Sequence, residues 1–219
     1  MEEYKRYVHQ IKETLDNLPW EAIRNTISLL HYARLTDKQV FIMGNGGSAS
    51  TASHMVCDLA KQTAIPGRPR FRVIALTDNM ALFSAYANDN GYENVFAEQL
   101  ASFVRKGDIV IGISGSGNSL NVLKAIELAK KVGAVTIGWT GFDGGKLAQI
   151  VDLSLNVPNY CMEQVEDIHL MLEHLMVTAL RRAILADDMT LPKEFIPELW
   201  GLRLMVGIQN GHTEKVLNG

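Results

Sequence analysis

Apolar residues at the beginning of the chain recur every three or four positions, which is the period of an amphipathic helix. One such stripe lies between residues 4 and 15 and a second between residues 23 and 33. The segment Asn17-Leu18-Pro19 separates them, and a proline in this position favours a turn. The pattern therefore predicts two amphipathic N-terminal helices.

After residue 36 the pattern changes to short β-branched runs, each followed by a glycine-rich or polar turn and then by an amphipathic stretch. The expected strands are residues 40–43, 71–76, 109–113, 135–139 and 153–157. Strands that alternate with helices need crossover connections, so we expect an α/β fold with three layers around a doubly wound, five-stranded parallel sheet. Such strands should be buried on both faces.

A long segment with helical periodicity, residues 162–186, follows the last expected strand. We therefore divide the chain into N-terminal helices (1–36) that belong to the domain and to an oligomer, a core domain (37–186) and a C-terminal extension (187–219). Within the extension, residues 194–209 are expected to form one more helix.

Composition narrows the class of protein. With 219 residues, 47% of them hydrophobic, and a formal net charge of −3, the chain is expected to be one soluble domain without general affinity for nucleic acid. The absence of a long apolar run argues against a membrane span, and we expect a cytoplasmic protein. Cys57 and Cys161 are expected to be reduced, packed thiols.

Three glycine-rich loops follow expected strands, at residues 44–50, 114–119 and 140–146. In open α/β sheets, ligands bind beyond the carboxyl ends of the strands, where helix N-termini offer free N–H groups. Small residues allow the backbone to approach an anion closely, and serine hydroxyls add donors. The serine-rich second loop therefore indicates a site for a phosphate monoester.

A dinucleotide site is the main alternative for the first loop. Gly44, Gly46 and Ala49 fit the pattern G-x-G-x-x-A, and Asp78 follows the second expected strand, where a ribose-binding carboxylate would lie. That motif is weak, and it leaves the serines of the second loop unexplained. A sugar phosphate accounts for both loops.

Ionisable residues in two helical segments are candidates for a metal site. His54 and Asp58 lie four positions apart and so share a helix face, although a surface ion pair would have the same spacing. The apolar segment after residue 162 carries more ionisable groups than a buried helix normally holds. These groups are Glu163, Glu166, Asp167, His169, Glu173 and His174. Of them, His169 is expected to be structural, with a hydrogen bond to Asp58 or Asp89.

Six ordered motifs, GNGGSAS, SHxxxD, NDNGYENVF, SGSGNS, TGFDGGKL and VEDIHxxxxH, resemble those of the sugar isomerase (SIS) domain proteins. The resemblance covers roughly residues 1–184 and is strongest to the phosphoheptose isomerases, which convert sedoheptulose 7-phosphate to D-glycero-D-manno-heptose 7-phosphate. It implies that the phosphate lies at the serines of the first two loops. The implied substrate-binding residues are Asn45, Gly46, Gly47, Ser48, Asp89, Ser114, Gly115, Ser116, Ser119, Glu163 and Glu166.

The resemblance also implies a zinc ion held by His54, Asp58, Glu166 and His174. Two of these depart from the family pattern, because Asp58 stands where Glu is usual and Glu166 stands where Gln is usual. Two histidines and two carboxylates still suit zinc. Glu166 and His174 lie about 12 Å apart along a helix, which favours a site shared between chains of a homo-oligomer, expected to be a tetramer.

An isomerase of this kind moves a proton between C1 and C2 of the sugar through an enediol. Asp58 is the candidate base and His174 the candidate acid or second base. Instead of binding substrate, Asp89 could stabilise the turn in which it lies.

Two alternative functions stay open. One is a non-catalytic SIS module of the DnaA initiator-associating type, which binds a protein partner, and the other is a sugar-phosphate sensor.

Overall fold

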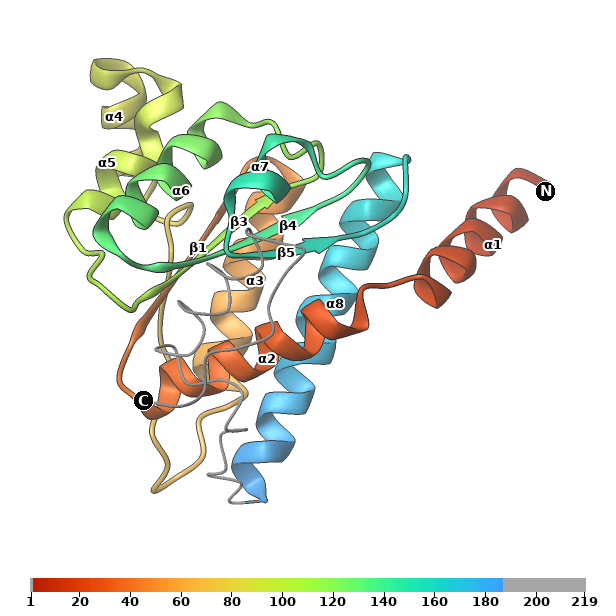
Figure 1. The fold of residues 1–219 in the computed structure, drawn as a ribbon, viewed down its shortest axis with the longest axis horizontal. Coiled ribbons are helices and arrows are strands. Elements are labelled where there is room, and N and C mark those ends of the chain that lie inside the picture. Colours follow the sequence, from red (N-terminus) through yellow and green to blue (C-terminus); the bar gives the residue numbers. More distant parts are fainter. Residues whose placement is uncertain (1, 187–219) are drawn as a thin grey trace, which may run out of the picture.

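The computed structural model describes residues 2–186, and the helix expected at 194–209 lies outside them. Helix α1 (Glu2–Asp16) and helix α2 (Trp20–Leu35) form where the apolar stripes predict them, and they are separated at residues 17–19. In Figure 1, α1 extends away from the body of the molecule. Its only buried residue is Thr14.

Five parallel strands form the sheet, in the spatial order β2-β1-β3-β4-β5. Their bounds are β1 (Gln39–Gly44), β2 (Arg72–Ala75), β3 (Ile109–Ser114), β4 (Val135–Thr140) and β5 (Leu153–Asn156). All five lie where the sequence predicts strands. The expected fold class is confirmed, including the long helix α8 (Met162–Leu185) after the last strand.

Helices cover both faces of the sheet (Figure 1). Helices α2, α3 (Gly47–Lys61) and α8 lie on one face. The other face carries α5 (Val95–Ala101), α6 (Leu120–Val132) and α7 (Gly145–Ile150), with α4 (Met80–Asn90) and the short 3-10 helix η1 (Tyr92–Asn94) beside α5. Alternate strand residues enter two separate cores, as Ile42 and Phe41 show.

Burial of the strands differs from the expectation at one edge. β1 and β3 are buried almost throughout, but Arg72 and Ile74 of β2 are exposed. β2 is an edge strand with a neighbour on one side only, and these two side chains are accessible to solvent.

The two cysteines are free, as expected, but only one of them is packed. Cys161 is partly buried, whereas Cys57 is exposed because it falls on the solvent-facing side of α3. Among residues 2–186, no helix is long and apolar enough to cross a membrane.

Candidate functional site

The strand order brings the first two glycine-rich loops together. β1 and β3 are neighbours, and the chain leaves them toward α3 on one face and α6 on the other, so a crevice forms between the loops. Asn45 bridges this crevice, because its side-chain amide exchanges two hydrogen bonds of 2.9 Å with that of Asn121. The Tyr92 hydroxyl also donates to Asn45 Oδ1, at 2.9 Å.

Hydroxyl groups and helix N-termini line the same crevice. Ser48 and Ser114 are buried, and the Ser114 and Ser119 hydroxyls lie 3.0 Å apart. Neither α3 nor α6 has a side-chain N-cap. Ala49 N–H donates to the Gly46 carbonyl and Val122 N–H to Asn121 Oδ1, both at 3.0 Å, which leaves the first two N–H groups of each helix to meet an anion. Gly46 precedes α3 with a φ of 55°, a conformation that favours glycine.

Asn118 joins the second loop to the third. Its Nδ2 donates to the Ser116 carbonyl at 2.9 Å, and its Oδ1 accepts from the Lys146 backbone N–H at 3.1 Å. Gly117 lies directly against the Gly144 carbonyl, where a Cβ would overlap. These contacts set the position of the exposed Ser116 hydroxyl, which accepts from the Asn118 N–H at 3.3 Å.

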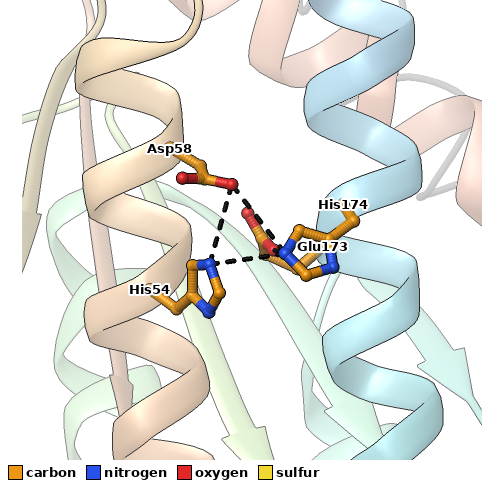
Figure 2. A group of neighbouring side chains, drawn as sticks. All are labelled: His54, Asp58, Glu173 and His174. Atoms are coloured by element: carbon orange, nitrogen blue, oxygen red, sulfur yellow. Dashed lines mark hydrogen bonds and ion pairs between the residues drawn. The ribbon is translucent and has the colours of Figure 1, made fainter.

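A second group of functional side chains lies between α3 and α8, and Figure 2 shows the four pointing toward one another. Its members are His54 and Asp58 from α3 and Glu173 and His174 from α8, and one ligand atom from each lies within 4.8 Å of all the others. The two imidazole Nε2 atoms are 3.3 Å apart. His174 Nε2 is also 3.3 Å from Glu173 Oε2 and 4.0 Å from Asp58 Oδ2, while His54 Nε2 is 3.7 Å from Asp58 Oδ2.

The two carboxylates of this group are buried and the two imidazoles are half exposed. The side chain of Glu173 is 0% exposed and that of Asp58 is 7% exposed, against 42% for His54 and 50% for His174. Neither Glu173 oxygen accepts a hydrogen bond within residues 2–186, and neither does Asp58 Oδ2. Burial, together with the nearby Asp58 charge, raises the pKa of Glu173 to about 7.

A divalent cation fits these observations. Two ligand atoms at about 2.0–2.1 Å from a tetrahedral zinc ion lie about 3.3 Å apart. The His54–His174 and His174–Glu173 distances, both 3.3 Å, match that spacing. A cation would also supply the buried carboxylate oxygens with the partner that they lack.

Glu166 does not belong to this group. Its carboxylate lies over the first turn of α3, against Gly47, where a Cβ would overlap it. Gly115 has a similar reason to be glycine, since a Cβ there would overlap the Met162 sulfur. Glu166 of α8 therefore lies at the crevice between the glycine-rich loops and away from the two histidines.

The other predicted residues lie farther out. Glu163, in the first turn of α8, accepts from the Cys161 thiol at 3.2 Å. A hydrogen bond from its own backbone N–H, and then the bond from Cys161, lower the pKa of Glu163. Asp89 is exposed near the end of α4, where it accepts from the Asn88 amide at 2.7 Å. Asp78 accepts a short hydrogen bond from Ser53 of α3.

His169 makes a hydrogen bond to a different partner from the one expected. Its Nε2 lies 3.2 Å from the Thr140 carbonyl, and its ring contacts Trp139, so it bonds to neither Asp58 nor Asp89. The reason is its position on α8, since His169 faces the sheet and is buried there. Burial lowers the pKa of His169 to about 4.

Sequence reasoning missed Glu173, Asn118 and Asn121 as site residues. Glu173 belongs to the group of ionisable residues that is too large for a buried helix, and that excess was the available signal. Asn118 lies within the serine-rich loop and Asn121 just after it, but nothing in the sequence indicates that they bond to the neighbouring loops.

Comparison with known proteins gives consistent matches. The SIS domain family model matches residues 3–141. The phosphoheptose isomerase of Geotalea daltonii is 35% identical over 190 residues, which cover 85% of this chain and 98% of that protein. The phosphoheptose isomerase of Helicobacter pylori (strain P12) is 36% identical over 180 residues, which cover 82% of this chain and 93% of that protein.

Solved structures agree with these relatives. The phosphoheptose isomerase of Neisseria gonorrhoeae superposes with a TM-score of 0.74 at 29% identity, covering 81% of this chain and 94% of that one. The one from Francisella tularensis has a TM-score of 0.76 at 28% identity, covering 83% and 95%.

Proposed function

Because the chain belongs to the phosphoheptose isomerase family of SIS-domain proteins, we propose that it interconverts sedoheptulose 7-phosphate and D-glycero-D-manno-heptose 7-phosphate. The observation that carries this proposal is that two sites lie along one helix. A crevice with serine hydroxyls and two uncapped helix N-termini lies at one end of α3, and a group of histidines and carboxylates lies farther along the same helix.

The phosphate of the sugar binds in the crevice in this proposal. Ser48, Ser114, Ser116 and Ser119 supply hydroxyl donors, and the first turns of α3 and α6 supply backbone N–H groups. Donors of this kind hold a phosphate dianion without a lysine or arginine. Gly46, Gly47 and Gly115 allow the backbone to approach the bound sugar phosphate closely, and Asn45 holds the first loop against the second.

Proton transfer falls to Asp58 and His174. A base removes the proton from C1 of the ketose while the C2 carbonyl oxygen gains one, which gives the enediol, and the proton then returns to C2 as the O1 hydroxyl loses its own. Asp58 is the proposed base. His174, half exposed and adjacent to Asp58, donates and accepts the proton at the sugar oxygens.

We propose that the metal is zinc, with His54, Asp58 and His174 among its ligands. Zinc accepts nitrogen and carboxylate ligands in a tetrahedral arrangement, and the spacing of the two imidazoles fits it. When bound, it would supply a positive charge that polarises the sugar carbonyl. Asp89, Glu163 and Glu166 are proposed to contact sugar hydroxyl groups.

We further propose a homo-oligomer, with four chains as the expected number, in the cytoplasm. Two exposed apolar surfaces support association of this chain with copies of itself. Tyr4 and Val8 of α1 are 77% and 52% exposed, and Trp20 at the beginning of α2 is 54% exposed. A groove lined by Met171, Leu175 and Ala179 lies beside His174 on α8, so a partner chain there would adjoin the site.

The decisive experiment is an isomerase assay on purified protein with a panel of ketose phosphates of five, six and seven carbons. We expect turnover of sedoheptulose 7-phosphate in excess over the shorter sugars. Binding of a sugar phosphate without turnover would favour the sensor function instead. If neither binding nor turnover occurs, the chain is a non-catalytic SIS module.

A further inference from the structure

We propose that Glu173, and not Glu166, is the fourth ligand of the metal, and that Glu166 serves the sugar-phosphate crevice instead. The proposal rests on the proposed function only in taking the group between α3 and α8 as a metal centre. It assigns different roles to two carboxylates of one helix.

The first observation in support of the proposal is the position of Glu173. Its Oε2 lies 3.3 Å from His174 Nε2, and its side chain points into the gap between α3 and α8 together with the two imidazoles and Asp58 (Figure 2). Glu173 is completely buried, and within residues 2–186 neither of its oxygens accepts a hydrogen bond.

A buried carboxylate without a partner is unfavourable, and here a second carboxylate makes it more so. Asp58 is itself buried, and its Oδ2 accepts no hydrogen bond within residues 2–186. The chain places no lysine or arginine against either group among the ion pairs of the described residues. A divalent cation bound by both carboxylates would neutralise the two charges and satisfy their oxygens.

Glu166 lies at a different place on α8. Its carboxylate lies against Gly47, at the first turn of α3, whereas His54 and Asp58 come two and three turns later on the same helix. The N-terminus of α3 favours a negative charge, and Gly47 provides the room for it. A carboxylate in that position lies away from the metal and beside the crevice, where it can accept hydrogen bonds from sugar hydroxyl groups.

Asp58 and Glu173 come from two facing helices, and their carboxylates meet in the same gap between α3 and α8. The resulting ligands are two neutral imidazoles and two carboxylates, which balance the charge of Zn²⁺. All four come from one chain.

The test compares zinc affinity in Glu173→Gln and Glu166→Gln by competition with a chromophoric chelator. Each variant changes one carboxylate to an amide of the same shape, so each serves as the matched control for the other. We expect Glu173→Gln to weaken zinc binding at least ~100-fold and Glu166→Gln to change it less than ~3-fold. Replacement of zinc by Co²⁺ gives a second readout, because the visible absorption of bound cobalt should shift in Glu173→Gln only.

Thermal unfolding of the metal-free proteins shows whether Glu173→Gln folds. Removal of a buried charge beside Asp58 should leave its melting temperature equal to or above that of the metal-free parent, whereas added zinc should stabilise the parent more than the variant. Unchanged zinc affinity in Glu173→Gln, or an equal loss in Glu166→Gln, would overturn the proposal.

Failure of the proposed function would look different. A protein that binds zinc through Glu173 but isomerises no sugar phosphate would leave this ligand assignment intact. A protein that isomerises sugar phosphates but binds neither zinc nor cobalt would overturn the ligand assignment alone.

Discussion

Asn45 and Asn121 exchange two side-chain hydrogen bonds of 2.9 Å and thereby join the loop after β1 to the beginning of α6. Asn121 is 2% exposed, and its Oδ1 also accepts from the Val122 backbone N–H at 3.0 Å. The pair holds the two sides of the crevice at a fixed separation, which a bound phosphate needs if it is to contact both loops.

Replacement of Asn121 by leucine should therefore impair substrate binding more than folding. We expect KM for the sugar phosphate to rise about 10-fold, and the free energy of unfolding to fall by about 1–3 kcal/mol, because Asn45 loses a buried partner. Steady-state kinetics and urea denaturation measure the two effects. Asn17→Ala, at an exposed position just after α1, is the control, and a KM in Asn121→Leu equal to that of the control would contradict this role.

Combined replacement of Ser116 and Ser119 by alanine should weaken sugar-phosphate binding by about 10- to 100-fold, since each hydroxyl contributes a hydrogen bond to a charged group. The chain should still fold, because neither hydroxyl lies in a core. Isothermal titration with a ketose phosphate measures the affinity, with Ser84→Ala on α4 as the control. Unchanged affinity would contradict the assignment of the phosphate to this loop.

Asp58→Asn should lower kcat at least ~10²-fold, since an amide cannot accept the C1 proton. The zinc content of the variant must be measured beside its turnover, because Asp58 is also a proposed ligand. If turnover by Asp58→Asn stays low at saturating zinc, the loss comes from the missing base and not from missing metal. The exposed Asp16→Asn is the control, and full activity in Asp58→Asn would exclude Asp58 as the base.

His169 should make the stability of the fold depend on pH. Its pKa is about 4 in the folded chain and about 6.5 when unfolded, so the unfolded state binds more protons between these values. The contribution, on the order of 3 kcal/mol, is complete above pH 6.5 and is lost as the pH falls toward 4.

The measurement compares the free energy of unfolding of the parent and of His169→Gln from pH 7.5 to 4. Residues Trp139 and Thr140, which His169 contacts, do not titrate in this range. Glu173, whose raised pKa acts in the opposite direction, is present in both proteins, so its effect cancels in the difference. Parallel pH profiles for the two proteins would refute the assignment.

The hydrophobic pattern by itself determined the order and type of the elements of this protein. Strand and helix periods are local properties, and the short apolar runs at 40–43 and 109–113, rich in β-branched residues and followed by turn residues, favour buried strands. Parallel pairing followed from the alternation with helices. The edge of the sheet at which the glycine-rich loops 44–50 and 114–119 lie also followed, because both loops come after strands of a parallel sheet. That the two loops face each other across a crevice depends on the adjacency of β1 and β3, which the tertiary structure set.

The partners of individual side chains were decided only by the tertiary structure. The pattern of α8 shows that Glu166, Glu173 and His174 share a helix, but not which of them faces α3, since that depends on how the two helices pack. Spacing along one helix suggested that Glu166 and His174 would need a second chain to share an ion. In the folded chain, Glu173 lies beside His174, while Glu166 lies against Gly47, because side-chain contacts between helices are set by their packing and not by distance in sequence.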